Sequence, residues 1–130
     1  MFIANQKLTH PSLNSGCGPL GLLTLAVAKA YGVKKIVMFD IERSRANFAE
    51  SYGADVGIVM PKDTVSSNSS LDVAQEYAEE IVKKYGEGNG FDVAVEASGA
   101  EICAQLAVCV LKSGGTCTWS CRPRHLYYCD

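Results

Sequence analysis

The sequence predicts an α/β fold, a doubly wound parallel sheet with helices on both faces. Three observations lead to this fold class. From residue 16 onward, short apolar runs of strand length alternate with longer stretches of helical periodicity. The short runs are continuous rather than alternating, as in parallel strands covered on both sides. Glycines stand where the helical patterns stop, as helix ends require.

Composition indicates one ordinary globular domain, because 48% of the residues are hydrophobic and 20% are charged. A net charge of −2 gives no reason to expect a nucleic-acid or membrane partner. No apolar run approaches the roughly 20 residues of a membrane helix, and the start of the chain does not resemble a signal peptide. We therefore expect a cytoplasmic protein whose six cysteines are reduced thiols.

The first predicted helix covers residues 20–31 and is apolar nearly all round, so it is expected to be buried. Gly32 is expected to end it. Residues 34–40, KKIVMFD, then read as a parallel strand.

A second helix is predicted over 43–53, with Ala46, Ala49 and Tyr52 on one face. The weaker apolar run at 55–60 predicts a third strand.

A polar loop, 65–70, precedes a helix predicted over 71–86, with Ser69 or Ser70 as its N-cap and Gly86 at its end. Its apolar stripe comprises Leu71, Ala74, Tyr77, Ala78, Ile81, Val82 and Tyr85.

The last predicted elements are a strand at 91–97, a helix over 100–112 and the start of another strand at 116–120. Cys103 and Cys109 fall within the helical pattern, where cysteine acts as a small core residue.

A glycine cluster precedes the first helix and has the spacing of a phosphate-binding loop. Gly16 suits a tight turn, Gly18 lets the backbone approach a pyrophosphate, and Gly21 lets the helix pack closely on the sheet. Pro19 suits the first helical turn, and Leu20 has a free N–H for a phosphate. Because glycine clusters also serve merely as turns, the motif alone is weak evidence.

Asp40 strengthens the interpretation of the glycines as a phosphate-binding loop, because this acid ends a predicted strand shortly after them. A carboxylate there can accept hydrogen bonds from both hydroxyls of an adenosine ribose and would repel a 2′-phosphate. We therefore expect NAD rather than NADP as the cofactor, although Arg43 and Arg45 lie nearby. The alternative is that Asp40 only ends its strand.

Ser98 and Gly99 follow the strand at 91–97, at the edge where open α/β sheets bind ligands. They are candidates to line the nicotinamide-side ribose. Equally, Ser98 is a candidate cap of the next helix.

Cys17 lies inside the glycine cluster near a helix start, a position that favours a thiolate. The simpler interpretation, a small side chain in a tight turn, is preferred.

Residues 16–45 and 90–116 together resemble the cofactor-binding domain of the medium-chain, zinc-dependent polyol dehydrogenases, in particular the sorbitol and xylitol dehydrogenases (D-xylulose reductases). The resemblance implies a Rossmann-type domain in which Leu20 lies at the pyrophosphate, Asp40 binds the adenosine ribose and Arg45 lies beside the adenine. Ile41 is also expected at this cofactor site. In such a family a hydride passes from a polyol to NAD, while zinc in a separate catalytic domain polarises the alcohol oxygen.

The chain departs from this family at both ends. Residues 8–15, LTHPSLNS, are polar where an apolar strand should precede the glycines, so the sheet is expected to lack its central strand. It is also expected to lack the later strands that the family has beyond residue 115. Three regions are predicted: a non-matching segment 1–15, a partial NAD-binding domain 16–120 and an irregular tail 121–130. Ligands for the family's zinc are absent, so no catalytic residue is assigned. We interpret the chain as truncated, and we do not expect it to be catalytically active on its own. Its oligomeric state is left open.

Two other functions are compatible with the glycine motif. An S-adenosylmethionine-dependent methyltransferase has a similar first motif, but usually with glycine where this chain has Leu20. A non-catalytic nucleotide-binding remnant is the other.

The tail contains four evenly spaced potential zinc ligands but is not expected to hold a metal, because Pro123 would break the helix that aligns them. They are Cys117, Cys121, His125 and Cys129.

Overall fold

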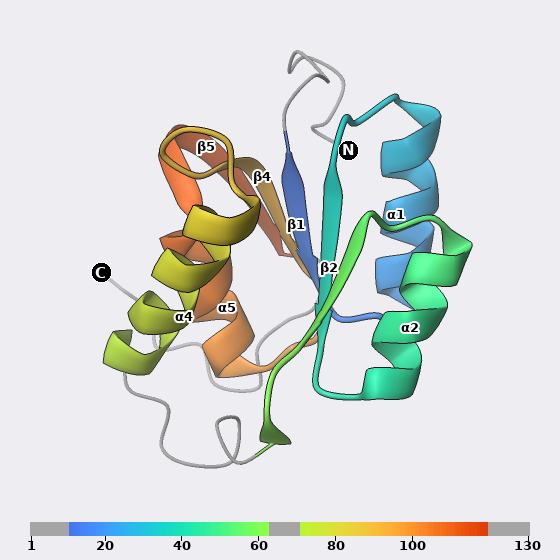
Figure 1. Cartoon of the computed structure of the whole chain (residues 1–130), viewed down its shortest axis with the longest axis horizontal. Coiled ribbons are helices and arrows are strands. Elements are labelled where there is room, and N and C mark those ends of the chain that lie inside the picture. Colours follow the sequence, from blue (N-terminus) through green and yellow to red (C-terminus); the bar gives the residue numbers. More distant parts are fainter. Residues whose placement is uncertain (1–10, 63–70, 120–130) are drawn as a thin grey trace.

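A computed structural model describes residues 11–62 and 71–119 and confirms the predicted fold class (Figure 1). Its parallel sheet has the strand order β3-β2-β1-β4-β5. The strands are β1 (Ser12–Ser15), β2 (Ile36–Asp40), β3 (Val56–Val59), β4 (Phe91–Glu96) and β5 (Leu111–Trp119). The helices are α1 (Pro19–Ala30), α2 (Arg43–Tyr52), α4 (Leu71–Tyr85) and α5 (Glu101–Cys109).

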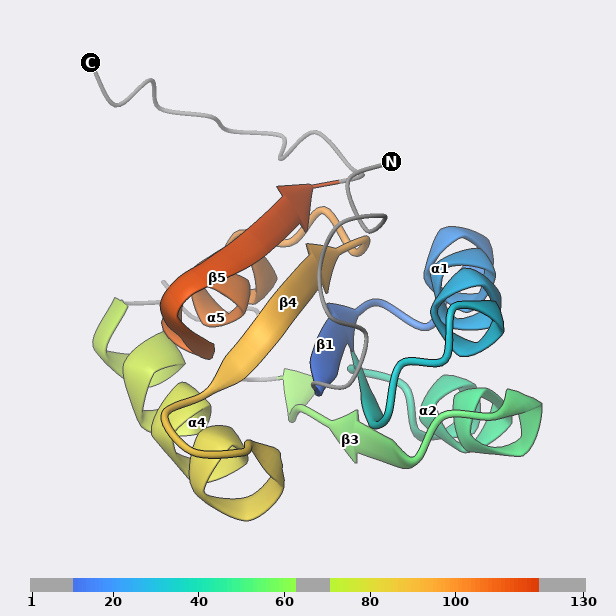
Figure 2. The same ribbon diagram turned by 90° about the horizontal axis from the view of Figure 1, so that it is seen from above.

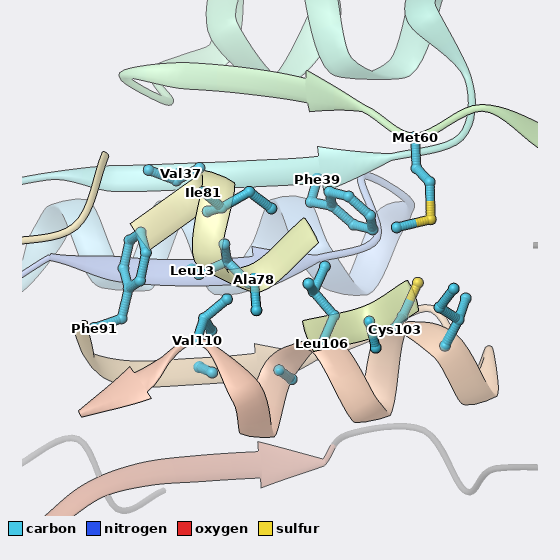
Figure 3. Packing of buried hydrophobic residues seen from close by; sticks show 14 residues of the cluster. Leu13, Val37, Phe39, Met60, Ala78, Ile81, Phe91, Cys103, Leu106 and Val110 are labelled. Atoms are coloured by element: carbon cyan, nitrogen blue, oxygen red, sulfur yellow. The ribbon is translucent and has the colours of Figure 1, made fainter. Parts of the chain in front are cut away.

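The helices form a layer on each face of the sheet, α1 and α2 on one and α4 and α5 on the other (Figures 1 and 2). Two cores result. The larger lies under α4 and α5 and includes Leu13, Phe39 and Phe91, all fully buried (Figure 3). The smaller core, under α1 and α2, is built around Leu25 and Met38. The larger core thus joins side chains from the first half of the chain, such as Phe39, to side chains from the second half, such as Phe91.

The expectation that the central strand is missing was wrong, because β1 occupies that position. Ser12–Ser15 pairs with β2 on one side and β4 on the other. Pro11 precedes the strand rather than interrupting it, so its missing N–H costs no bond within the ladder. Leu13 alone supplies a large apolar side chain and is fully buried. Backbone pairing on both edges therefore compensates for the apolar side chains whose absence suggested that no strand was present.

Helix α1 is not buried all round, contrary to expectation. Leu20 and Leu23 are 40% and 63% exposed, whereas Gly21 and Leu25 face the sheet. With one sheet face on one side, only a stripe of the helix can be covered.

The same geometry corrects two other assignments. Ala46 and Ala49 of α2 are fully buried as predicted, but Tyr52 is half exposed and its ring stacks on Phe48. In α4, Leu71 at the first position is exposed, while Ala74, Ala78 and Ile81 carry the buried stripe.

The boundary between α5 and β5 also differs from the prediction. The helix ends at Cys109, and residues 111 and 112, predicted as helical, already belong to β5, where Leu111 pairs with Phe91 of β4. The register shifts between Phe91 and Val93, where β5 passes through Gly114 at a φ of 80°. This irregularity lets the strand begin earlier than its apolar pattern indicates.

Several expectations concern residues outside the described ranges. They are the caps Ser69 and Ser70, the loop 65–70, and the tail residues Cys121, Pro123, His125 and Cys129. Within the described ranges, no helix combines the length and apolarity needed to cross a membrane.

Candidate functional site

A pocket of about 210 Å³ lies at the carboxyl ends of β1, β2 and β4, the lower edge of the sheet in Figure 1. Six of the predicted site residues line it: Gly16, Gly18, Asp40, Ile41, Arg45 and Ser98. Four further lining residues had no predicted role there: Phe39, Ala97, Ala100 and Cys103. The other predicted residues do not line it: Pro19, Leu20, Gly21 and Gly99.

The turn from β1 into α1 requires glycine at two of its three glycine positions. Gly16 has a φ of 92°, and a Cβ there would lie 3.0 Å from the backbone of Ala97 and Ser98. A Cβ on Gly21 would lie 1.8 Å from the carbonyl oxygen of Gly16. The turn and the first turn of α1 are therefore packed backbone against backbone, as predicted for the Gly21 position.

Gly18 differs, because nothing in the protein would meet a Cβ there within 4 Å. Its φ of −77° is also one that any residue can adopt. Gly18 borders the pocket, so a side chain at this position would occupy open pocket space. The protein's own packing thus gives no reason for this glycine.

The N-terminus of α1 is left without a side-chain cap, and its first turn contains no acidic residue. Pro19 occupies the first turn as predicted, and Leu22 donates the first helical bond, to the carbonyl of Gly18. The N–H groups before it have no intrahelical acceptor, and they form the positive end of the helix dipole. The arrangement is suited to an anion.

Asp40 lies at the end of β2, only 7% exposed, and each oxygen of its carboxylate accepts a backbone N–H. Oδ2 accepts from Cys17 at 2.7 Å, and Oδ1 accepts from Glu42 at 2.9 Å. The acid therefore ties the glycine turn to the β2–α2 turn. A carboxylate has about four acceptor sites, so acceptor capacity remains on the pocket side.

Arg45 is exposed on the first turn of α2 and lines the same pocket beside Ile41. Among the described residues that line the pocket, it is the only cationic side chain. The pocket thus combines an acid at the strand end with a base on the next helix.

Ser98 and Gly99 form the turn after β4 and are held by a residue that the sequence analysis left without a role, Glu96. The carboxylate of Glu96 is fully buried. Its Oε1 accepts the N–H groups of Ser98 at 2.7 Å and Gly99 at 2.9 Å, and the hydroxyl of Ser98 at 2.5 Å. An acid at a strand end, two residues before a Ser-Gly turn, was the available signal. Ser98 also accepts the N–H of Ala100 at 3.2 Å, but Ala100 is the N-cap of α5 and no side chain caps that helix, so the alternative of Ser98 as the cap was wrong.

Two buried cysteines, Cys103 of the pocket lining and Cys17 of the glycine turn, have raised pKa values. Burial and the negative charge of Asp40 raise the pKa of Cys17 to about 12. Burial raises the pKa of Cys103 to about 11. Cys17 is therefore a small buried side chain in the turn and not a reactive thiolate.

The described residues do not fit a zinc site. No group of three or more His, Cys, Asp or Glu side chains capable of holding a metal occurs between 11 and 62 or between 71 and 119.

Comparison with known proteins identifies the domain type. The family model of the zinc-binding dehydrogenases matches residues 19–120. D-xylulose reductase A of Aspergillus niger is 41% identical over 101 residues, which cover 78% of this chain and 26% of that protein. Sorbitol dehydrogenase 1 of Saccharomyces cerevisiae is 40% identical, with the same coverage. The chain thus spans about a quarter of the length of these relatives.

A solved structure agrees with these matches. The apo form of zinc-dependent alcohol dehydrogenase 2 from Streptococcus pneumonia superposes with a TM-score of 0.67 at 27% identity, covering 85% of this chain and 29% of the other. The resemblance to the cofactor-binding part of the polyol dehydrogenases is therefore confirmed.

Proposed function

Because the chain belongs to the zinc-binding dehydrogenase family, we propose that its pocket binds NAD. The pyrophosphate lies over Gly18 at the N-terminus of α1. The adenosine ribose lies on Asp40, with Ile41 and Arg45 at the adenine end. Ser98 and Gly99 lie at the nicotinamide-side ribose. The backbone N–H groups of Leu20 and Gly21 face the phosphates beside Pro19, while Gly16 shapes the turn.

The observation that carries this proposal is the open space at Gly18. A glycine that no neighbour in the protein requires, beside an uncapped helix N-terminus, leaves room for a group that approaches the backbone closely. A pyrophosphate fits both features, because it is anionic and needs N–H donors.

The preference for NAD over NADP rests on Asp40. Its carboxylate would repel a 2′-phosphate, and its backbone bonds fix it in place. Arg45 opposes this preference, because its cation would attract such a phosphate.

Hydride transfer between a sugar alcohol and NAD is the activity we propose for a longer protein that contains this domain. The described residues supply neither zinc ligands nor a group placed to take the alcohol proton. The dehydrogenase matches disfavour a methyltransferase.

The four described cysteines are free thiols, which supports the proposal of a reducing, cytoplasmic compartment.

Thermal unfolding of the chain with NAD, NADP or S-adenosylmethionine tests the proposal. We expect NAD to stabilise most, by about 2.7 kcal/mol at a hundredfold excess over its dissociation constant. Asp40→Asn should reduce the NAD-induced shift relative to its own unliganded transition.

Asp55→Asn is the matched control. Asp55 also accepts a backbone N–H, that of Ile36 at 2.7 Å, but at the opposite edge of the sheet. It should change stability without changing the NAD-induced shift. A transition raised only by S-adenosylmethionine, or by no nucleotide, would contradict the proposal.

A further inference from the structure

Glu96 does not line the pocket, but it holds the turn after β4, which does. It ends β4, beside the central strand, and is fully buried. A carboxylate in this position is costly unless donors surround it. The donors to its Oε1 come from the turn that lines the pocket, chiefly Ser98 and Gly99.

The short bond from the Ser98 hydroxyl fixes the polarity of that hydroxyl. A hydroxyl has one proton, and in this bond that proton points at Oε1 of Glu96. The lone pairs of the Ser98 oxygen are left for other donors. The Ala100 N–H takes part of this capacity at 3.2 Å, and the Cys103 side chain lies beside Ser98.

The turn held by Glu96 is also the wall against which the glycine turn packs. Ala97 donates its N–H to the carbonyl of Ser15 at 2.9 Å, and Gly16 has no room for a side chain against Ala97 and Ser98. The hydroxyl of Ser15 reaches Oε1 of Glu96 at 3.4 Å. The position of Ser98 relative to the phosphate-facing turn therefore depends on one carboxylate.

We propose that Glu96 is a positioning residue for the nicotinamide-side ribose of the cofactor. Glu96 accepts the hydrogen bond that the Ser98 hydroxyl donates. The Ser98 oxygen is thereby presented to the pocket as a hydrogen-bond acceptor for a ribose hydroxyl. The inference rests on the proposed function, and it adds the group that orients Ser98.

ADP and ADP-ribose are the probes, because both contain the adenosine and two phosphates and only ADP-ribose has the second ribose. Calorimetric titration of the 130-residue chain gives the two affinities for wild type, Glu96→Gln, Ser98→Ala and the double variant. We expect each single variant to weaken ADP-ribose binding by roughly 3- to 10-fold, while ADP affinity changes less than about twofold.

The double variant separates positioning from independent contacts. Because Glu96 acts through Ser98, the double variant should lose no more ADP-ribose affinity than Ser98→Ala alone. Ser98→Thr, which keeps a hydroxyl, should restore most of the wild-type ratio between the two affinities. Asp55→Asn, a carboxylate that holds backbone away from the pocket, should leave that ratio unchanged.

Ser98→Ala keeps the test decisive if Glu96→Gln fails to fold, because Ser98 is exposed and its removal leaves Glu96 two backbone donors. An unchanged ratio in Ser98→Ala, or additive losses in the double variant, would overturn the inference and leave NAD binding intact. A wild-type chain that binds neither probe nor NAD would instead overturn the proposed function, and the inference with it.

Discussion

Asn14 destabilises the central strand β1. It is 1% exposed, and neither its side-chain oxygen nor its nitrogen has a hydrogen-bond partner in the described structure. Leaving a buried polar group unpaired costs about 1–3 kcal/mol. Asn14→Val removes both polar atoms at similar shape and suits a buried parallel strand.

We therefore expect Asn14→Val to raise the free energy of unfolding by about 1–3 kcal/mol, measured by urea denaturation. Ser51→Ala, at an exposed position of α2, is a neutral comparison. Lower stability in the valine variant would mean that the amide has a partner in solution.

Predictability differed from residue to residue for a physical reason. Asp40 and the glycines were found because their chemistry is tied to local spacing, and the structure brings Gly16, Gly18 and Asp40 to one pocket. Glu96 was missed because its role depends on donors that become neighbours only after the turn forms. Whether the pocket residues bind NAD stays a prediction until it is measured.

The start of α1 separates glycines required by packing from glycines that leave space. Gly21→Ala forces a methyl group against the Gly16 carbonyl, so we expect a loss of at least about 2 kcal/mol in unfolding free energy. The methyl group of Gly18→Ala contacts nothing in the protein, so the free energy of unfolding should change by less than about 1 kcal/mol. Its methyl group would, however, enter the proposed pyrophosphate site.

Thermal unfolding and NAD titration of the two variants measure both effects. Gly18→Ala should weaken NAD binding by about tenfold or more, that is, about 1.4 kcal/mol. Equal affinity in Gly18→Ala and wild type would contradict the proposed place of the pyrophosphate.

At the scale of elements, the apolar pattern predicted most helices and strands. It failed where backbone pairing with neighbouring strands determines whether a segment is a strand. Strand β1 was rejected for its polar residues, although β2 and β4 bind its backbone on both sides. The α5 pattern was extended into β5, because Leu111 fits both a helix face and a strand. Neither case can be settled without knowing which segment lies alongside.

The whole molecule depends on β1 to join its halves. In the described part of the chain, this strand joins the two sides of the sheet, β3-β2 and β4-β5, by backbone pairing. Hydrogen exchange followed by mass spectrometry should therefore find the amides of residues 12–16 among the slowest, opening only with global unfolding. Amides of the edge strand β5 should exchange faster. Rapid exchange in residues 12–16 would contradict the central position of β1.

The central place of β1 also has a consequence for synthesis on the ribosome. The strand is made before β2 and can pair with it once β2 emerges, yet its other edge must wait for residues 91–96. At about 5–20 residues per second, the nascent chain carries an open strand edge for several seconds. Such an edge is a template for pairing with another chain. A ribosome-associated chaperone that shields the first half of the chain would thus protect the step on which the whole sheet depends.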